Sequence, residues 1–399
     1  MIGDGWDGDP SIRPGPPDPP ARGVHRIAVV TGTRAEFGLL EPVMRAILNR
    51  PDQQLAVIAA GAHLVSPALT YREVKAAFGA HIADAVPMQV AGRTGRAADV
   101  EALGRGIARF GRAFERLSPD WVVVLGDRIE AFAAASAASV GGFCVAHIHG
   151  GDRAEGIADE AMRHAITKLA HLHLAATERS RERIIRMGER SEHAMITGSP
   201  AIDGLDAVPP LDDRAVRDLG LERAPTVLFL MHPIGRPAEV EEAAAARVLE
   251  GLSAERVLAL HPNLDPGREG ILRAVESAGV PTVSHLARAQ FIGLLKRMAG
   301  GGGVLVGNSS AGLIEGAAIP VPVVDIGPRQ AGRERCGNAI HTDSEQSQTV
   351  AGAVKEARAL NLSRLNHPYG DGRAGPRIAE ALAAVNPHDP KLLRKRCAF

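Results

Sequence analysis

Short apolar runs alternate with amphipathic segments along most of the chain. Runs such as HRIAVVTG and WVVVLGD are almost continuously apolar, as expected of strands that are buried on both faces of a sheet. The segments between them, such as TRAEFGLLEPVMRAILNR and DVEALGRGIARFGRAFERL, place apolar residues at helical spacing. This alternation predicts parallel sheets with right-handed helical crossovers.

The alternation of strands and helices occurs twice. The first series starts at Val24 and continues through QLAVIAA, FCVAHIHGG and LHLAA, and the second contains TVLFLMHP, RVLALHP, VPTVSH, GVLVGNSS and VPVVDIG. Between them, the turn-rich stretch from Gly198 to Asp213 is the candidate linker. We therefore predict an α/β fold with two Rossmann-like, doubly wound domains at 24–203 and 204–375, followed by a terminal helix and basic tail at 376–399.

The two ends of the chain differ from its body. Residues 1–23 are rich in Gly and Pro, are acidic and lack the apolar stretch of a signal peptide, which predicts a disordered leader. The last residues, KLLRKRCAF, are interpreted as a solvated extension, with binding of an anionic partner as the alternative.

Composition narrows the class of protein. The 399 residues are enough for two domains, and 46 Lys and Arg balance 46 Asp and Glu. This balance argues against a nucleic-acid or membrane-surface protein, and no apolar run reaches membrane-spanning length. The three cysteines, Cys144, Cys336 and Cys397, lack metal-type spacing and suit a reducing cytosol, so we expect a cytoplasmic protein.

Two motifs suggest phosphate binding, because ligands of parallel sheets bind where the strands end. In TGTRAEFG, Arg34 could clamp a phosphate, or the motif could be an N-capping turn with an exposed arginine. It is neither a dinucleotide fingerprint nor a Walker loop, so no NAD is implied. In GNSSAGLIEGAA, the hydroxyls of Ser309 and Ser310 suit a β-phosphate, and N-capping would explain only one of them.

Residues close to the second motif extend this interpretation. Glu315 lies within the next turns and could reach a ribose diol. Arg329 follows the next strand, together with two further arginines, and is interpreted as a phosphate clamp, with a solvated face as the alternative.

Acid and base candidates follow two strands of the first series. Asp127 and Arg128 come directly after WVVVLG, where the Asp could abstract a proton or cap the next helix. The following strand leads into HIHGGDRAEGIADEAMRH, in which spacing i,i+4 puts Glu160 with His164 and Asp159 with Arg163 on shared helix faces. No zinc pattern is matched, so acid/base and sugar-binding roles are favoured over a metal.

Taken together, these motifs resemble one known family. TGTRAEFGLL, AGAHL, GDRIEA, HIHGGDRAEGIADEAMRHAITKLAHLHLAATERS, ITGSPAID, HPNLDPG, GNSSAGLIE and GPRQAGRE occur in one order between Val24 and about Thr342. They resemble the UDP-N-acetylglucosamine 2-epimerases, most closely the hydrolysing branch. The resemblance implies a glycosyltransferase-B architecture with an interdomain cleft. It also implies conversion of UDP-GlcNAc and water to N-acetylmannosamine and UDP through elimination and water addition.

The resemblance also assigns roles to individual residues. It implies no cofactor and no essential metal, and we expect a homodimer or homotetramer. The catalytic candidates are Asp127, His149, Asp159, Glu160, Arg163 and His232, with His232 matching a position near the nucleotide. The substrate-binding candidates are Arg34, His63, Arg128, Asn263, Ser309, Ser310, Glu315 and Arg329.

Several alternatives stay open at this point. The donor could be GDP-GlcNAc or a UDP-2,4-diacetamido-trideoxyhexose, and residues at 62–71 and 153–159 would decide the sugar. The enzyme could also be a non-hydrolysing epimerase. The RHAITKLAHLH and GSP signatures favour hydrolysis, and His149 stands where non-hydrolysing relatives generally, and some hydrolysing ones, have Glu. A catalytically silent nucleotide-sugar-binding protein and a two-lobed glycosyltransferase are further alternatives.

Overall fold

The computed structural model describes residues 17–66, 69–154, 159–263 and 265–398. The chain forms two compact units. Unit 1 contains Met1–Asp152, Asp159–Asp203 and Gly370–Phe399, and unit 2 contains Arg153–Ala158 and Gly204–Tyr369. Most of the predicted leader, and parts of the two segments expected to select the sugar, lie outside the described residues.

Unit 1 is built on a parallel seven-stranded sheet with the order β3-β2-β1-β4-β5-β6-β7. Strand β1 is the point at which the order reverses, since Val29 pairs with Val57 of β2 on one side and Val123 of β4 on the other. Its strands are β1 (His25–Thr31), β2 (Gln53–Ala60), β3 (Ile82–Val86), β4 (Trp121–Leu125), β5 (Cys144–Ile148), β6 (Leu172–Ala175) and β7 (Ala194–Ile196).

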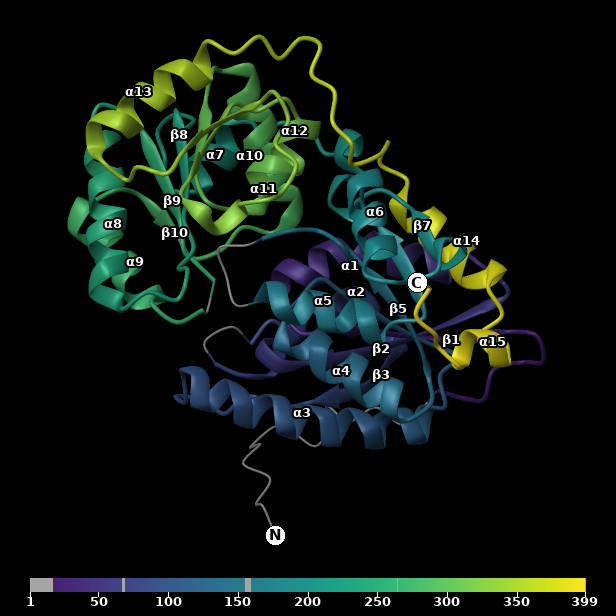
Figure 1. The fold of residues 1–399 in the computed structure, drawn as a ribbon. Helices are drawn as coiled ribbons and strands as arrows, with labels where there is room; N and C mark the ends of the chain where they lie inside the picture. The colour runs from purple at the N-terminus through teal and green to yellow at the C-terminus, as the bar shows by residue number, and fades with distance from the viewer. Residues whose placement is uncertain (1–16, 67–68, 155–158, 264, 399) are drawn as a thin grey trace. The chain divides into compact units, whose positions relative to one another are not determined.

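Helices cover both faces of this sheet. One apolar core joins it to α1, α2 and α14, and a second joins it to α3, α4 and α5 (Figure 1). The helices of unit 1 are α1 (Arg34–Leu48), α2 (Tyr71–Phe78), α3 (Arg96–Leu117), α4 (Ile129–Val140), α5 (Asp159–Leu169), α6 (Glu178–Arg186), α14 (Ala374–Ala384) and α15 (Pro390–Leu393).

Unit 2 repeats this plan with a six-stranded parallel sheet in the order β10-β9-β8-β11-β12-β13. Its strands are β8 (Val227–Leu230), β9 (Val257–Leu260), β10 (Thr282–Val283), β11 (Val304–Gly307), β12 (Val323–Ile326) and β13 (Ala339–Thr342). Its helices are α7 (Asp213–Asp218), α8 (Ala238–Gly251), α9 (Arg268–Ala278), α10 (Arg288–Gly300), α11 (Ser310–Leu313), α12 (Glu315–Ala318) and α13 (Ser347–Arg358). The predicted pair of Rossmann-like lobes is confirmed.

The terminal helix starts earlier than 376 and belongs to unit 1. The carboxylate of Asp203 accepts hydrogen bonds from the backbone N–H groups of Ala374 and Gly375, at 2.9 and 2.6 Å. Gln53 of β2 donates from Nε2 to the carbonyl of Ala379 at 2.8 Å, which ties the helix to the sheet. These contacts explain why the chain returns to unit 1 at Gly370.

The basic tail is exposed at most of its described residues, but it also packs against unit 1. Residues 390–393 form α15, and Leu392 is only 4% exposed in the core of unit 1. Beyond it, the N–H of Ala398 donates to the carbonyl of Gly188 at 2.9 Å. Figure 1 shows this yellow segment lying beside β1 and α14. A charge count does not reveal that Leu392 and one of the lysines find buried partners.

Over the residues that the structure describes, no helix combines the length and apolar character needed to cross a bilayer.

Candidate functional site

The turn after β1 has the geometry of a helix cap. Thr33 accepts from the N–H of Glu36, and the Glu36 carboxylate accepts from the N–H groups of Gly32 and Thr33 at 2.7 and 3.3 Å. This reciprocal pair is a capping box. Arg34 follows it and pairs with Glu73 at 2.9 Å, with side chains 28% and 43% exposed. The capping alternative is therefore present, and the guanidinium of Arg34 is half-buried in its ion pair with Glu73.

His63 is buried beneath this turn. Its Nε2 lies 2.9 Å from Thr31 Oγ1 and its Nδ1 lies 2.6 Å from Thr70 Oγ1, and the residue is 0% exposed. Burial and the charge of Arg34 lower the pKa of His63 to about 4, so the ring is neutral at pH 7. Both ring nitrogens have partners, so His63 links the end of β1 to the residue before α2 in this structure.

Two buried carboxyl groups lie at the same edge of the sheet, and sequence analysis did not select either. Glu36 is 5% exposed and Glu130 is 1% exposed. Burial, with the neighbouring charge of Glu130, raises the pKa of Glu36 to about 8. A Cβ on Gly61 would lie 2.3 Å from Glu130 Oε1, so the backbone must approach this carboxyl closely. The Thr-x-x-Glu spacing of the capping box was the available signal for Glu36.

An ion pair links the strand-end aspartate to α5. Asp127 accepts from Arg163, whose side chain is 5% exposed, and Arg163 Nη1 also donates to the carbonyl of His149 at 3.2 Å. Asp127 does not cap α4, because the N-cap position is Arg128. Asp159 lies 3.8 Å from Nη1 of Arg128. Asp159 and Arg163 thus both lie on α5 at the predicted i,i+4 spacing, and each pairs with a residue that follows β4.

His149 is held in an unusual backbone conformation. Its φ is +63°, which costs a non-glycine residue about 1–3 kcal/mol unless surrounding contacts fix it. Nδ1 lies 2.9 Å from Asp152 Oδ2 and Nε2 lies 3.0 Å from Ser199 Oγ. Ser180 Oγ donates to the other oxygen of Asp152 at 2.7 Å.

This carboxylate–imidazole–hydroxyl order is the one that activates serine nucleophiles. Ser199 is 0% exposed, however, so its hydroxyl orients the imidazole of His149 and has no room to attack a substrate. The network therefore fixes His149 directly after β5, beside the Arg163–Asp127 pair.

The first turn of α5 carries the remaining acid candidates of unit 1. Glu160 pairs with His164 at 3.2 Å, as the i,i+4 spacing predicts, and its side chain is 18% exposed. Asp159 is 22% exposed. Both carboxyl groups keep contact with solvent, whereas Arg163 on the same helix is buried.

In unit 2, the ends of β8, β9 and β11 are joined by one hydrogen-bond network. Asn308 accepts from the N–H of His232 at 2.7 Å and returns a bond from Nδ2 to the His232 carbonyl at 2.8 Å. The N–H of Asn263 donates to His232 Nδ1 at 3.1 Å, so that nitrogen is an acceptor. Asn263 also donates to Asp265. The structure thus brings His232 and Asn263 together.

The phosphate-binding candidates of unit 2 surround the same strand end. Ser309 is the N-cap of α11 and accepts from the N–H of Ala311, so capping accounts for this hydroxyl. Ser310 opens α11, and Arg329 Nη1 donates to the carbonyl of Asn308 at 3.2 Å. Glu315 starts α12 and lies 3.9 Å from Arg288. Four predicted residues therefore cluster after β11.

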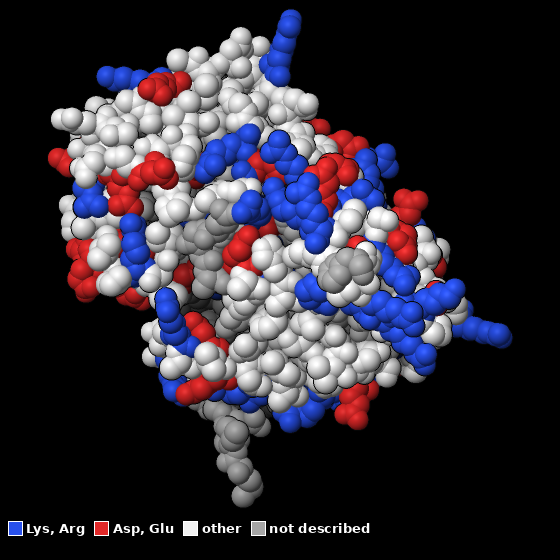
Figure 2. All heavy atoms as spheres, in the orientation of Figure 1, with Lys and Arg blue, Asp and Glu red and all other residues white. Residues whose placement is uncertain are grey.

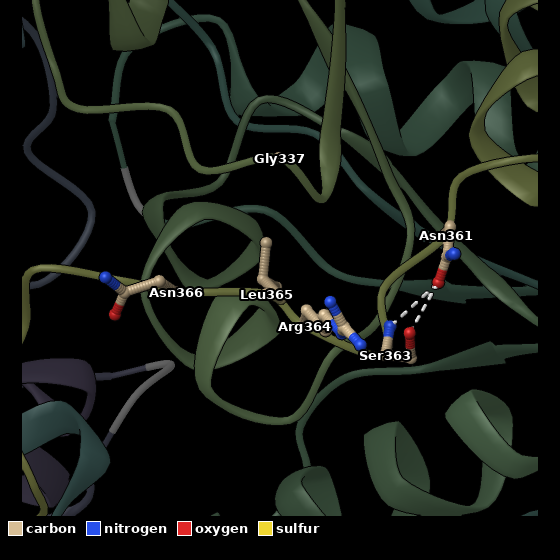
Figure 3. Close-up of a pocket in the computed structure, with 6 residues that line it drawn as sticks. All are labelled: Gly337, Asn361, Ser363, Arg364, Leu365 and Asn366. Carbon is tan, nitrogen blue, oxygen red and sulfur yellow. Dashed lines mark hydrogen bonds between the residues drawn. The ribbon is translucent and has the colours of Figure 1, made fainter.

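Two other features of the described residues lie away from these candidates. His25, Asp120 and His388 could share a metal ion, but they are at the amino ends of β1 and β4, where His388 and Asp120 already form an ion pair of 2.8 Å. The hollow in Figure 3, about 590 Å³, is lined by Gly337 and by residues of 361–366 in unit 2, where Asn361 accepts from Ser363. It contains none of the predicted site residues.

Comparison with known proteins defines the class. The sequence model of the family described as UDP-N-acetylglucosamine 2-epimerase matches residues 45–383. A UDP-N,N'-diacetylbacillosamine 2-epimerase (hydrolyzing) of Legionella pneumophila is 34% identical over 94% of this chain and 100% of that protein. The chain therefore belongs to the UDP-N-acetylglucosamine 2-epimerase family.

Other similar proteins agree with this assignment. A UDP-N-acetylglucosamine 2-epimerase of Neisseria meningitidis serogroup B is 33% identical over 87% of this chain and 91% of that protein. Among solved structures, a Neisseria meningitidis UDP-GlcNAc 2-epimerase bound to UDP-GlcNAc has a TM-score of 0.75 at 19% identity, covering 90% of this chain and all of that one. This structural likeness supports the two-lobed fold.

Proposed function

We propose that this enzyme is a hydrolysing 2-epimerase that converts UDP-GlcNAc and water to N-acetylmannosamine and UDP. The observation that carries the proposal is the ion pair of Asp127 with the buried Arg163 beside His149, in a chain that belongs to the 2-epimerase family. The Arg163 guanidinium fixes the direction of the Asp127 carboxylate, which suits a group that takes up a proton.

The chemistry explains why two sets of residues are needed. The proton on C2 of the sugar is not acidified by a carbonyl group, so departure of UDP must lead or accompany its loss. Stabilising the diphosphate as it leaves should supply much of the rate enhancement. The Ser310 hydroxyl and the guanidinium of Arg329 in unit 2 suit that task, and the carboxyl groups of Asp127, Asp159 and Glu160 in unit 1 suit proton transfer.

A second donor is favoured by a specific observation. The Legionella pneumophila relative, which is similar along its whole length, is named for UDP-N,N'-diacetylbacillosamine, a UDP-linked 2,4-diacetamido sugar. The same elimination and water addition at C1 and C2 would release the corresponding free 2-epimeric sugar. Hydrolysis is supported by the word "hydrolyzing" in the name of this relative and of a Campylobacter jejuni relative that is 29% identical.

The decisive experiment is incubation of the purified protein with each UDP-sugar in D₂O, followed by NMR. The proposal predicts free UDP and a free sugar that is inverted and deuterated at C2. A UDP-linked 2-epimer would instead assign the non-hydrolysing reaction. Absence of turnover with either donor would contradict both candidate functions.

Replacing Asp127 by Asn tests the proposed proton-transfer group. Asp127→Asn keeps the shape of the side chain but removes the charge that pairs with Arg163, so we expect kcat to fall by about 10²-fold or more. UDP affinity, measured by calorimetry, should stay within about threefold, because a change at an acid/base group leaves leaving-group contacts intact. Near-normal turnover of this variant would remove Asp127 from the catalytic set.

A further inference from the structure

One cation of the C-terminal tail is turned into unit 1. Figure 2 shows Lys and Arg side chains gathered at the surface around the C-terminus. Lys391, Arg394 and Arg396 are exposed, but the side chain of Lys395 is only 23% exposed. The tail therefore contains three solvated charges and one that is directed inward.

The ammonium group of Lys395 closes the C-terminal end of α5. Its Nζ donates to the carbonyl of Thr167 at 3.0 Å, to the carbonyl of Ala170 and to Glu189 Oε2 at 2.7 Å. These contacts use all three N–H donors of a lysine. The last carbonyl groups of a helix have no partner within it, and a cation there also interacts favourably with the helix dipole. Lys395 thus acts as a cap for the helix that carries the acid candidates.

A buried carboxylate anchors this cap. Glu189 has a side chain that is 3% exposed, and it also accepts from Lys168 Nζ at 2.5 Å and from His173 Nε2 at 3.1 Å. Burial alone would raise the pKa of Glu189, but these hydrogen bonds together with that of Lys395 lower it to about 2. The carboxylate is therefore ionised at all working pH values and holds Lys395, Lys168 of α5 and β6 together.

Hydrogen bonds continue from the capped end of α5 to Asp127. Thr167 Oγ1 lies 3.2 Å from His147 Nδ1, and His147 Nε2 lies 2.8 Å from the carbonyl of Gly126, the residue before Asp127. Thr167 and His147 are both 0% exposed. One turn earlier on α5, Arg163 contacts Asp127 directly. A shift of α5 would thus disturb Asp127 both through its ion pair with Arg163 and through the hydrogen bonds of His147.

We propose that Lys395 is a positioning residue for the proposed 2-epimerase reaction, holding α5 so that Arg163 stays against Asp127. This inference rests on the proposed function, because it concerns the rate of that reaction. It assigns a catalytic contribution to the tail, whose composition alone suggests a solvated charge run. The tail acts through α5 and does not touch the reacting groups.

Lys395→Met tests the proposal, with Lys391→Met as its matched control. Met keeps the length of the side chain but cannot donate, so α5 should loosen and kcat should fall about tenfold with KM within about twofold. Lys391 is an exposed lysine of the same tail, and its replacement should leave kcat unchanged. Lys395→Arg, which keeps a donor and a positive charge, should recover at least half of the lost activity.

A double-mutant cycle separates positioning from general stability. Thr167→Val removes the hydroxyl contact to His147 but keeps the carbonyl that Lys395 binds, so its effect on kcat should be smaller in the Lys395→Met background than in the wild type. Amide hydrogen exchange of α5 should also quicken in Lys395→Met without substrate, while exchange in β1 and β4 stays slow.

The outcomes are distinguishable. Wild-type kcat and wild-type exchange of α5 in Lys395→Met would overturn the proposal. Uniformly faster exchange across unit 1, with kcat lost in proportion to the unfolded fraction, would also overturn it and leave only a stabilising role. If the wild type itself turns over neither UDP-sugar, the proposed function fails, and the exchange data still decide whether Lys395 holds α5.

Discussion

At the scale of single residues, Glu36 links protonation to stability. Its pKa is raised from 4.5 to about 8, so the folded state keeps a proton that the unfolded chain releases. Its contribution to stability is therefore fully present below about pH 4.5 and is lost as pH rises toward 8. Glu36→Gln, which resembles the protonated form and cannot ionise, should match the wild type at pH 5 and melt about 3 °C or more higher at pH 8.5.

The control for this prediction lies on the same helix. Glu41 is 31% exposed and pairs with Arg45 at the surface, so Glu41→Gln should leave the pH dependence of the melting temperature unchanged. Thermal unfolding followed by circular dichroism at both pH values checks it. Equal melting temperatures of Glu36→Gln and wild type at pH 8.5 would show that folding does not raise the pKa of Glu36.

The residue scale also shows what sequence could and could not predict of the candidate site. The chemistry-bearing positions after the strands, such as Asp127 and Ser309, were visible because each follows an apolar run that ends in a turn. Their partners were not visible, because Asp127 meets Arg163 and His149 meets Ser199 only through the fold. Partners 36 and 50 residues apart leave no local pattern.

At the scale of secondary-structure elements, the docking of α14 depends on one carboxylate. Asp203 is 7% exposed and accepts from two N–H groups at the start of the helix. Asp203→Ala leaves both donors without this acceptor in a buried place, so unit 1 should lose about 1–3 kcal/mol of unfolding free energy. Asp371→Ala, which removes an exposed partner of Arg377, should cost much less, because a solvated ion pair contributes little to stability.

Urea unfolding followed by hydrogen exchange of β1 and β2 measures the stability of unit 1 separately from that of unit 2. Equal losses in Asp203→Ala and Asp371→Ala would mean that the buried carboxylate is no more important than the surface ion pair. We instead expect the larger loss of unfolding free energy in Asp203→Ala, because an unsatisfied donor costs more when it is buried than when it is solvated.

The most deeply buried strands were the ones that the sequence predicted best. The central strands β4, β8 and β11 are continuous apolar runs, and β1 and β5 are mostly apolar, because neighbouring strands and helices cover them. The strands that were missed, β3, β7 and β13, all lie at sheet edges, where one side has no partner strand and polar residues are tolerated. Asp84 within β3 and His341 within β13 interrupt the apolar pattern that identifies a strand.

At the scale of the whole molecule, the two units have different chemistry. The acid/base candidates Asp127, Asp159 and Glu160 are in unit 1, and the nucleotide candidates Ser310, Glu315 and Arg329 are in unit 2. Binding and catalysis should therefore be separable by mutation. A ligand stabilises the part of a protein to which it binds, by about 2.7 kcal/mol at a hundred times its Kd.

UDP should accordingly slow the hydrogen exchange of β11 and of residues 308–313 in both the wild type and Asp127→Asn. Arg329→Met, which removes a guanidinium that lies against Asn308, should abolish that protection while leaving the exchange of β4 and α5 unchanged. Loss of UDP protection in Asp127→Asn, to the same extent as in Arg329→Met, would contradict the separation. Nucleotide recognition would then depend on the acid/base residues themselves, and their assignment to proton transfer would have to be replaced by one in which they hold the diphosphate.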